Sequence, residues 1–219
     1  MVSSLGPSWF LEADVIFDLI FFLVTGIVSW MGFRAYRFFK DERHRQFALG
    51  FFFICSSYLL LALTNLLIML EIRRLTDLVY TWRDIIAIAN LTYIGSLMHA
   101  ALFLIGLTML LFLYLQITEK KVKLLVLILV GFVILHSYRT RATIYAVTTI
   151  FLLFILVQLA ENYRRKRKRS SLLVMLGFGG VFLGECLLLA LFLGPIFYVA
   201  AGVTTLIGYL LILASLVRR

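Results

Sequence analysis

IYAVTTIFLLFILVQLAENYRRKRKR, residues 144–169, is the stretch that decides the fold of this chain. Seventeen residues without a charge lead into a tract that ends in six consecutive basic residues. Such a stretch is typical of a bilayer-spanning helix, because hydrocarbon offers no partner for unpaired backbone groups. The basic tract then marks the end of the helix that stays on the cytoplasmic side.

The same pattern recurs along the whole sequence. Hydrophobic residues make up 63% of the 219 residues and charged residues 15%, against about 45–50% and about 25% in a soluble domain. A spanning helix needs about 20 mostly apolar residues. The seven expected spans are residues 14–33, 47–70, 85–115, 122–136, 144–159, 172–192 and 196–216. The sequence therefore predicts an all-α integral membrane protein whose residues 1–219 form a single seven-helix transmembrane domain.

The basic residues alternate between the two ends of these spans. The loops after the first, third and fifth spans and the C-terminus together hold 16 of the 21 Lys and Arg residues. Cytoplasmic loops are enriched in such residues, so we expect a cell-membrane protein with its N-terminus outside the cell and its C-terminus in the cytoplasm. The first basic residue is Arg34, which favours a permanent first span over a cleaved signal peptide. Residues 75–84 are expected to lie at the outer membrane–water boundary.

A possible internal repeat follows from two similar regions. Tyr36-Arg37, a basic loop and Leu49-Gly50-Phe51 recur 127 residues later as Tyr163-Arg164, a basic loop and Leu176-Gly177-Phe178. This spacing predicts a 3+1+3 arrangement with repeats 14–115 and 144–216 and a linker helix at 122–136. The alternative is that both motifs are simply common at the ends of membrane helices.

Polar residues inside the spans are the candidates for function, because burying them in a bilayer is costly. Most fall in the outer half of the predicted bundle, which suggests an outward-facing polar pocket. The candidate pocket residues are Asp14, Asp18, Asn65, Asn90, Tyr93, His99, Glu185 and Tyr198.

Two of these candidates have open alternatives. Glu185 either joins helices as a neutral hydrogen-bonding group or pairs with His99 to relay a proton or bind a cation. Asp14 and Asp18 either line the pocket, or face headgroups and pair with Arg139 or Arg141.

The same sequence argues against most cofactors. The seven-span outline is similar to that of microbial rhodopsins, but all six lysines fall in predicted cytoplasmic loops, so no lysine is placed to hold retinal. The 3+1+3 layout is similar to sugar transporters of the SWEET type, whose repeated prolines are missing here. No haem, zinc or other metal-ligand pattern occurs, and Cys55 and Cys186 lie in apolar runs.

The net charge of +10 is explained by membrane orientation, and we expect no nucleic-acid partner. One basic tract also suits anionic lipid headgroups, at about 1 kcal/mol for each charge near such a surface. That tract consists of Arg164, Arg165, Lys166, Arg167, Lys168 and Arg169.

Two functions remain open on these grounds. The first is a sensor-like, receptor-like or complex-subunit membrane module that acts through binding and needs a separate protein partner. The alternative is a small transporter of a proton, cation or metabolite that uses Glu185 and the pair Asp14 and Asp18. No catalytic motif of the soluble enzyme classes occurs, so an enzyme is not expected.

Overall fold

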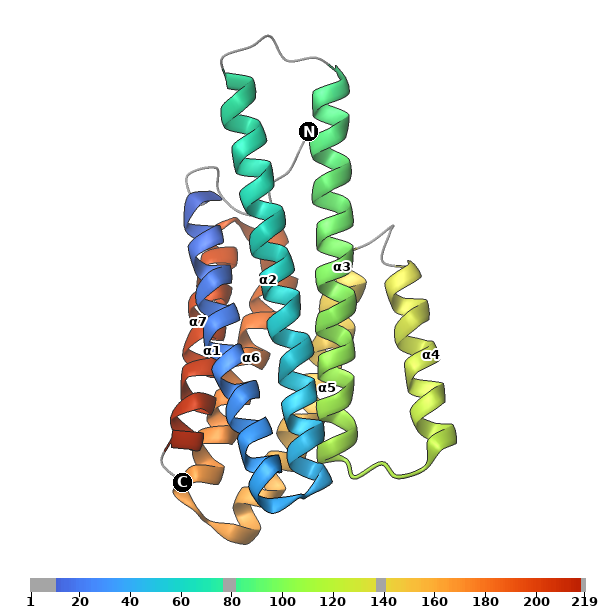
Figure 1. Ribbon diagram of the computed structural model, residues 1–219, viewed down its shortest axis with the longest axis vertical. Coiled ribbons are helices and arrows are strands. Elements are labelled where there is room, and N and C mark those ends of the chain that lie inside the picture. Colours follow the sequence, from blue (N-terminus) through green and yellow to red (C-terminus); the bar gives the residue numbers. More distant parts are fainter. Residues whose placement is uncertain (1–10, 77–81, 137–140, 218–219) are drawn as a thin grey trace.

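The computed structural model describes residues 11–76, 82–136 and 141–217, and within these ranges every regular element is helical (Figure 1). Seven α-helices and one short 3-10 helix follow one another along the chain. They are α1 (Leu11–Phe39), α2 (Glu42–Thr76), α3 (Trp82–Tyr114), α4 (Lys120–His136), α5 (Arg141–Lys166), α6 (Arg169–Leu189), η2 (Ala190–Leu193) and α7 (Ile196–Val217).

Six of these helices are long and apolar enough to cross a membrane. They are α1, α2, α3, α5, α6 and α7, and they make the chain a multi-pass membrane protein. The seventh, α4, forms where a short span is expected, but its 17 residues do not reach that length. Residues 77–81, within the expected interfacial segment, lie outside the described residues. Around them, α2 continues to Thr76 and α3 begins at Trp82.

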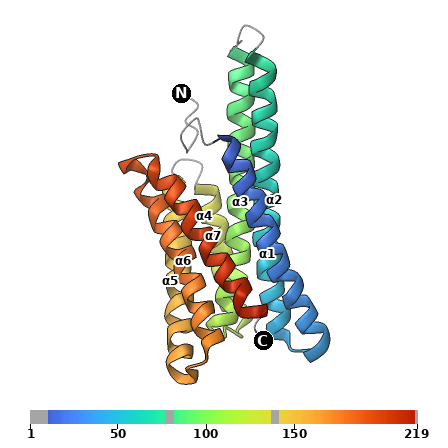
Figure 2. The same ribbon diagram turned by 90° about the vertical axis from the view of Figure 1, so that its left-hand side faces the viewer.

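The helices form two groups of three. Helix α2 packs between α1 and α3, and α6 packs between α5 and α7; the two groups meet where α3 contacts α5 and α1 contacts α7. Figure 2 shows α6 and α7 tilted against the first group. Helix α4 contacts only α3 and α5 and stands at the edge of the bundle (Figure 1). Helices α2 and α3 extend beyond all the others at one end.

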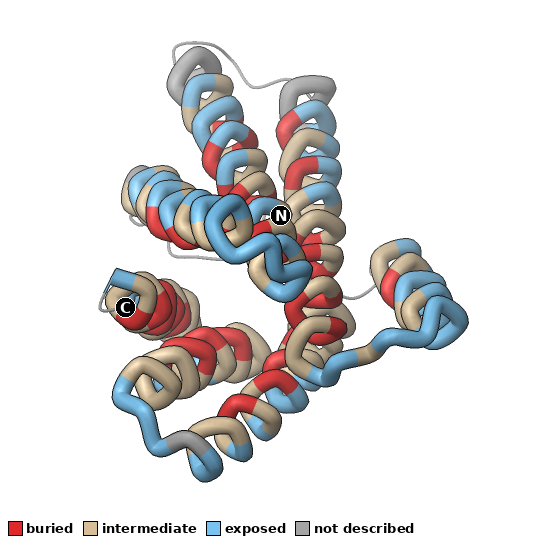
Figure 3. The backbone as a smooth tube through the Cα atoms, turned by 60° about the horizontal axis from the view of Figure 1, so that its bottom comes forward, coloured by how far each residue is buried: buried red, intermediate tan, exposed pale blue. Residues whose placement is uncertain are grey.

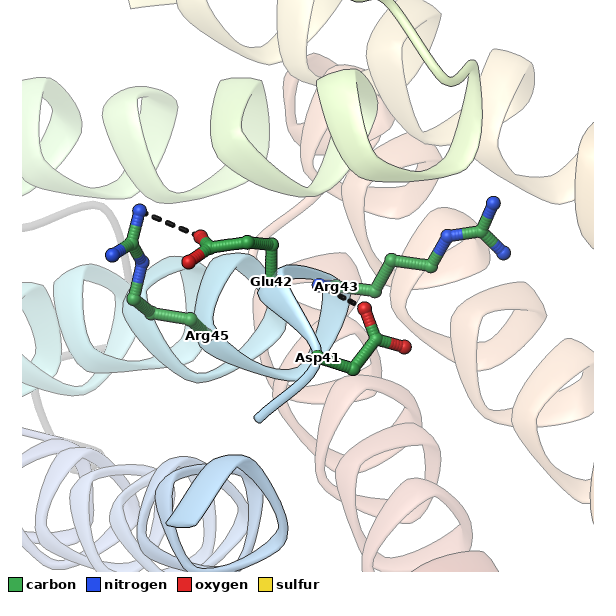
Figure 4. A network of polar contacts seen from close by, with 4 residues as sticks. All are labelled: Asp41, Glu42, Arg43 and Arg45. Carbon is green, nitrogen blue, oxygen red and sulfur yellow. Dashed lines mark hydrogen bonds and ion pairs between the residues drawn. The ribbon is translucent and has the colours of Figure 1, made fainter. Parts of the chain in front are cut away.

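The turns 39–42, 115–119 and 166–169 and the end of α7 lie together at the other end of the bundle, which we call the basic end (Figure 1). Helix α2 starts here with a capped first turn. The Asp41 carboxylate accepts a hydrogen bond from the Arg43 amide at 3.0 Å, and Glu42 pairs with Arg45 at 2.6 Å (Figure 4). The cap satisfies one of the four amide groups that a helix start leaves without a partner.

The turn between α1 and α2 and the turn between α5 and α6 have the same geometry. Lys40 and Arg167, which lie 127 positions apart, both adopt a left-handed backbone, with φ of 53° and 45°. Their amides donate to the carbonyls of Tyr36 and Tyr163, in both cases at 2.8 Å. The two turns differ in their caps, since Lys168, at the position of Asp41, gives α6 no side-chain cap.

Glycine contacts bring the neighbouring helices of each group close together. A Cβ atom on Gly106 would lie 2.6 Å from the carbonyl oxygen of Gly50, so α2 and α3 touch through their backbones. A Cβ atom on Gly208 would likewise lie 2.6 Å from the carbonyl oxygen of Gly177, on the crossing of α6 and α7. Small residues at such crossings allow the van der Waals contact that holds helices together in lipid.

The buried faces of the two groups follow the same register (Figure 3). Each buried residue in the described part of α5 and α6 lies 127 positions after a buried residue of α1 or α2. In α5 these residues are Thr148, Leu152, Ile155 and Leu159, and in α6 they are Gly177, Phe178, Val181, Gly184 and Glu185.

Aromatic side chains fill the space between the two groups. Phe51 and Phe178, again 127 positions apart, meet edge to face with ring centroids 6.3 Å apart. Nearer the other end, Phe21 stacks on Tyr58 at 4.8 Å and meets Tyr209 at 5.9 Å. The core therefore lies where the groups face each other, and it becomes more polar away from the basic end.

Candidate functional site

Two carboxyl groups on α1 lie at the end of the bundle opposite the basic end. Asp14 and Asp18 are one helical turn apart, and only 7% of the Asp18 surface is exposed. Asn65 on α2 donates to Asp18 Oδ2 at 2.8 Å, and the Tyr198 hydroxyl on α7 donates to Asp14 Oδ2 at 3.2 Å. The α1 carboxyl pair, Asp14 and Asp18, thus links helices of both groups.

The observed partners of the α1 carboxyl pair are neutral. In the described ranges, no Lys, Arg or His side chain forms an ion pair with Asp14 or Asp18. The expected pairing with Arg139 or Arg141 is not tested, because Arg139 lies outside the described ranges and the side chain of Arg141 is not described. Two acidic groups that lie close enough to interact electrostatically therefore share one region with amide and phenol donors only.

A pair of tyrosines lies deeper in the core. The hydroxyl oxygens of Tyr58 on α2 and Tyr209 on α7 are 3.4 Å apart, and both side chains are buried. The Tyr58 hydroxyl also lies within electrostatic range of Asp18. Polar groups therefore continue from the α1 carboxyl pair into the middle of the bundle.

His99 packs on the far side of Tyr58. Its ring centroid lies 5.5 Å from that of Tyr58 and 5.9 Å from that of Phe103. The His99 Nδ1 lies 3.1 Å from the backbone carbonyl oxygen of Ser57. A carbonyl oxygen only accepts, so Nδ1 carries a proton and donates it to this bond.

Glu185 does not form the expected pair with His99. Its side chain is 8% exposed, and it makes no hydrogen bond or ion pair with any residue in the described ranges. Its carboxyl group lies instead within electrostatic range of the Tyr58 and Tyr209 hydroxyls. The ring of Tyr58 is the neighbour that Glu185 and His99 have in common.

The remaining candidates, Asn90 and Tyr93, lie on α3. Asn90 is exposed, and Tyr93 is partly buried one turn closer to the core. The structure thus brings Asp14, Asp18, Asn65 and Tyr198 together through hydrogen bonds, but it does not join Asn90 to them.

Tyr58 is the residue that sequence reasoning missed. A tyrosine inside an apolar helix gives no signal of its own, because its ring fits a hydrophobic core. The spacing of the possible repeat gives a signal for Tyr58, because Tyr58 lies 127 positions before Glu185. Applied to the polar candidates, that spacing identifies Tyr58 as the counterpart of Glu185.

The basic tract lies on the turn between α5 and α6, at the basic end (Figure 1). Five of its six side chains are exposed, and the side chain of Lys166 is not described. The exposed residues are Arg164, Arg165, Arg167, Lys168 and Arg169. Their accessible charges suit the expected contact with anionic headgroups.

No protein-family model matches this chain, and neither does any curated protein or solved structure. Function is therefore argued from the geometry of the site alone.

Proposed function

We propose that this multi-pass protein consists of two parallel halves, α1–α3 and α5–α7, joined by α4. Three observations support the duplication: the matched turns, the matched glycine crossings and the contact between Phe51 and Phe178. Near a two-fold axis, a residue contacts its own counterpart, and Phe51 and Phe178 do so. In this proposal the axis runs along the membrane normal.

The proposed orientation places the basic end in the cytoplasm. The turns gathered there and the helix ends beside them carry 14 of the 21 Lys and Arg residues, as cytoplasmic loops do. For both halves to point the same way, α4 must also cross the bilayer. Its 17 residues give a length of about 26 Å, which a slightly thinned bilayer accommodates, with Lys120, Lys121 and Lys123 reaching the headgroups.

The function that we propose is binding at the outward end of the bundle, as in a sensor, a receptor or the subunit of a larger complex. The observation that carries the proposal is the α1 carboxyl pair, whose observed partners are neutral and come from both halves. Acidic groups at membrane depth are costly unless a positive charge accompanies them. A ligand or partner group with a positive charge would offset this cost and hold the two halves together.

The test uses butylammonium chloride as a cationic probe and the full chain in lipid nanodiscs. We expect the probe to raise the Tm by about 2–4 °C for each kcal/mol of binding free energy. The Asp14→Asn and Asp18→Asn variants should lose this increase, because each removes one carboxylate. The matched control is Glu161→Gln, which removes an exposed carboxylate near the basic end and should keep it.

An equal rise of the Tm in Asp18→Asn and in the unchanged chain would overturn the binding site. A second outcome would favour the transport alternative, which gains support from parallel halves with polar groups between them. In liposomes that contain a pH-sensitive dye, a proton flux that is lost in Asp18→Asn would identify a transporter. Sealed vesicles without flux, together with probe binding, support the binding module.

A further inference from the structure

Glu185 stands out among the buried side chains of the described ranges. Two carboxylic residues are buried there, and the other, Asp18, has a hydrogen-bond donor in Asn65. Glu185 has neither a donor nor a cation, although it lies in the core between the two groups of helices. A carboxylate in that position costs free energy unless a positive charge compensates it.

Hydroxyl groups from two other helices lie in the same part of the core as this carboxyl group. The Tyr58 hydroxyl on α2 and the Tyr209 hydroxyl on α7 both lie within its electrostatic range, and the two hydroxyls are 3.4 Å apart. Thr205 lies one turn from Tyr209 on α7, and its hydroxyl packs against Gly184, the residue before Glu185. Helices α2, α6 and α7 therefore supply oxygen atoms to one place.

The depth of this place follows from the helix register. Tyr58 and Glu185 each lie 16 residues after the first residue of their helix, Glu42 and Arg169. At 1.5 Å per residue, both stand about 24 Å from the basic end. Aromatic rings pack around Tyr58, since Phe21 stacks on it and Phe103 meets it edge to face.

We propose that Glu185, Tyr58 and Tyr209 form an interior site that holds a single positive charge, either a proton or an alkali cation. Carboxylate and hydroxyl oxygens are hard donors that suit both. In the described ranges, no group of three His, Cys, Asp or Glu residues is placed to hold a metal ion, so the donor set fits a monovalent charge. Exchange at the site replaces the carboxyl proton with the alkali cation and releases that proton to water.

The titratable side chains near Glu185 come from the helices that pack around it. Tyr58 is the neighbour from α2 and Tyr209 the neighbour from α7, and Cys186 is adjacent on α6. Helix α5 also packs on α6, and its described titratable side chains include Tyr145 and Tyr163. His99 lies behind Tyr58, with its Nδ1 proton engaged by Ser57. Tyr58 also lies within electrostatic range of Asp18, a member of the α1 carboxyl pair.

Infrared difference spectroscopy of the full chain in nanodiscs tests the site, because a protonated buried carboxyl has its own C=O stretching band. We expect a pH change to produce such a band in the unchanged chain and its loss in Glu185→Gln. Tyr58→Phe and Tyr209→Phe should retain the band but shift it to higher frequency, because each removes a hydroxyl dipole beside the carbonyl. Glu161→Gln serves as the control and should leave the band unchanged.

Two further arms identify the charge and separate this site from the outward one. At constant pH, a band that weakens in sodium or potassium chloride but not in choline chloride identifies an alkali cation. A band that responds to pH alone identifies a proton. Asp18→Asn should keep the band whatever the result at the α1 carboxyl pair. The proposal is overturned if Glu185→Gln keeps the whole spectrum, or if neither tyrosine variant shifts the band.

Discussion

Helices α1–α3 and α5–α7 agree at the basic end of the bundle and differ at the opposite end. Near the basic end, each group has a left-handed residue in its turn and a glycine at a close helix crossing. Each also contributes one of the two phenylalanines that meet between the groups. At the opposite end, α2 has 35 residues where α6 has 21, and α3 has 33 where α7 has 22. The first group therefore carries a projecting hairpin that the second lacks.

The chemistry diverges together with the length. The positions 127 residues after Asp14 and Asp18 hold Arg141 and Tyr145, so the acidic groups of α1 have no acidic counterpart on α5. Tyr58 corresponds to Glu185 in the same way. Close contacts between helix backbones tolerate little change in side-chain size, whereas polar side chains away from these contacts are free to differ. The basic end therefore holds the backbone contacts that both groups have in common, and the opposite end holds the polar side chains in which they differ.

The largest expected effect comes from the two phenylalanines that meet between the groups. Phe51→Ala and Phe178→Ala should each lower the free energy of unfolding by about 3–5 kcal/mol, because each leaves a cavity in the core. The double variant should lose less than the sum of the two, since both changes remove the same ring contact. Unfolding in mixed micelles measures this, with Phe132→Ala on the exposed face of α4 as a control of small effect. Unequal losses would break the comparison.

The glycine crossings come next in size. Gly106→Ala and Gly208→Ala each place a methyl group against a backbone carbonyl, and we expect a loss of about 1–3 kcal/mol in both halves. Gly131 on α4 has no atom within 4 Å of an added Cβ, so Gly131→Ala should not destabilise the protein. The same unfolding measurement compares the three variants. A crossing that accepts alanine in one half only would show that the two crossings are not equivalent.

The smallest expected effect concerns the side-chain cap, which is present at the start of α2 and missing at the start of α6. Asp41→Ala should cost about 1 kcal/mol, because it removes the side-chain cap of α2. Lys168→Asp should stabilise α6 by a similar amount, since it supplies the missing cap and places a negative charge at a helix start. The midpoint of thermal unfolding reports both changes. No gain from Lys168→Asp would mean that the second turn cannot use a cap.

Much of the helical framework could be predicted from the sequence. The long uncharged runs predict the helices, and the basic tracts identify the turns that lie together at one end. Helix α1 continues to Phe39, beyond the expected end at residue 33, whereas α6 ends at Leu189, before the expected end at residue 192. Such extensions add charged turns outside the apolar run, where hydrophobicity gives no boundary.

The contacts of the candidate site were less accessible to sequence reasoning. These helices are apolar on all sides, because both lipid and neighbouring helices accept apolar groups, so the pattern does not show which face is inside. That is why the bonds from Asn65 to Asp18 and from Tyr198 to Asp14 could not be foreseen. It also explains why a pairing of Glu185 with His99 stayed open as an alternative, although the His99 Nδ1 bonds to the carbonyl of Ser57.

The marginal position of α4 has a consequence for how such a chain could arise. A segment that crosses a bilayer three times ends on the side opposite its start, so a second copy fused directly to it would enter upside down. In the proposed topology, one extra crossing restores the direction, and α4 supplies it at the edge of the bundle, where its contacts with the other described helices are with α3 and α5. Two separate three-helix polypeptides would need no such connector. In the proposed duplication, a homodimer of three-helix chains would therefore have had the same core without α4.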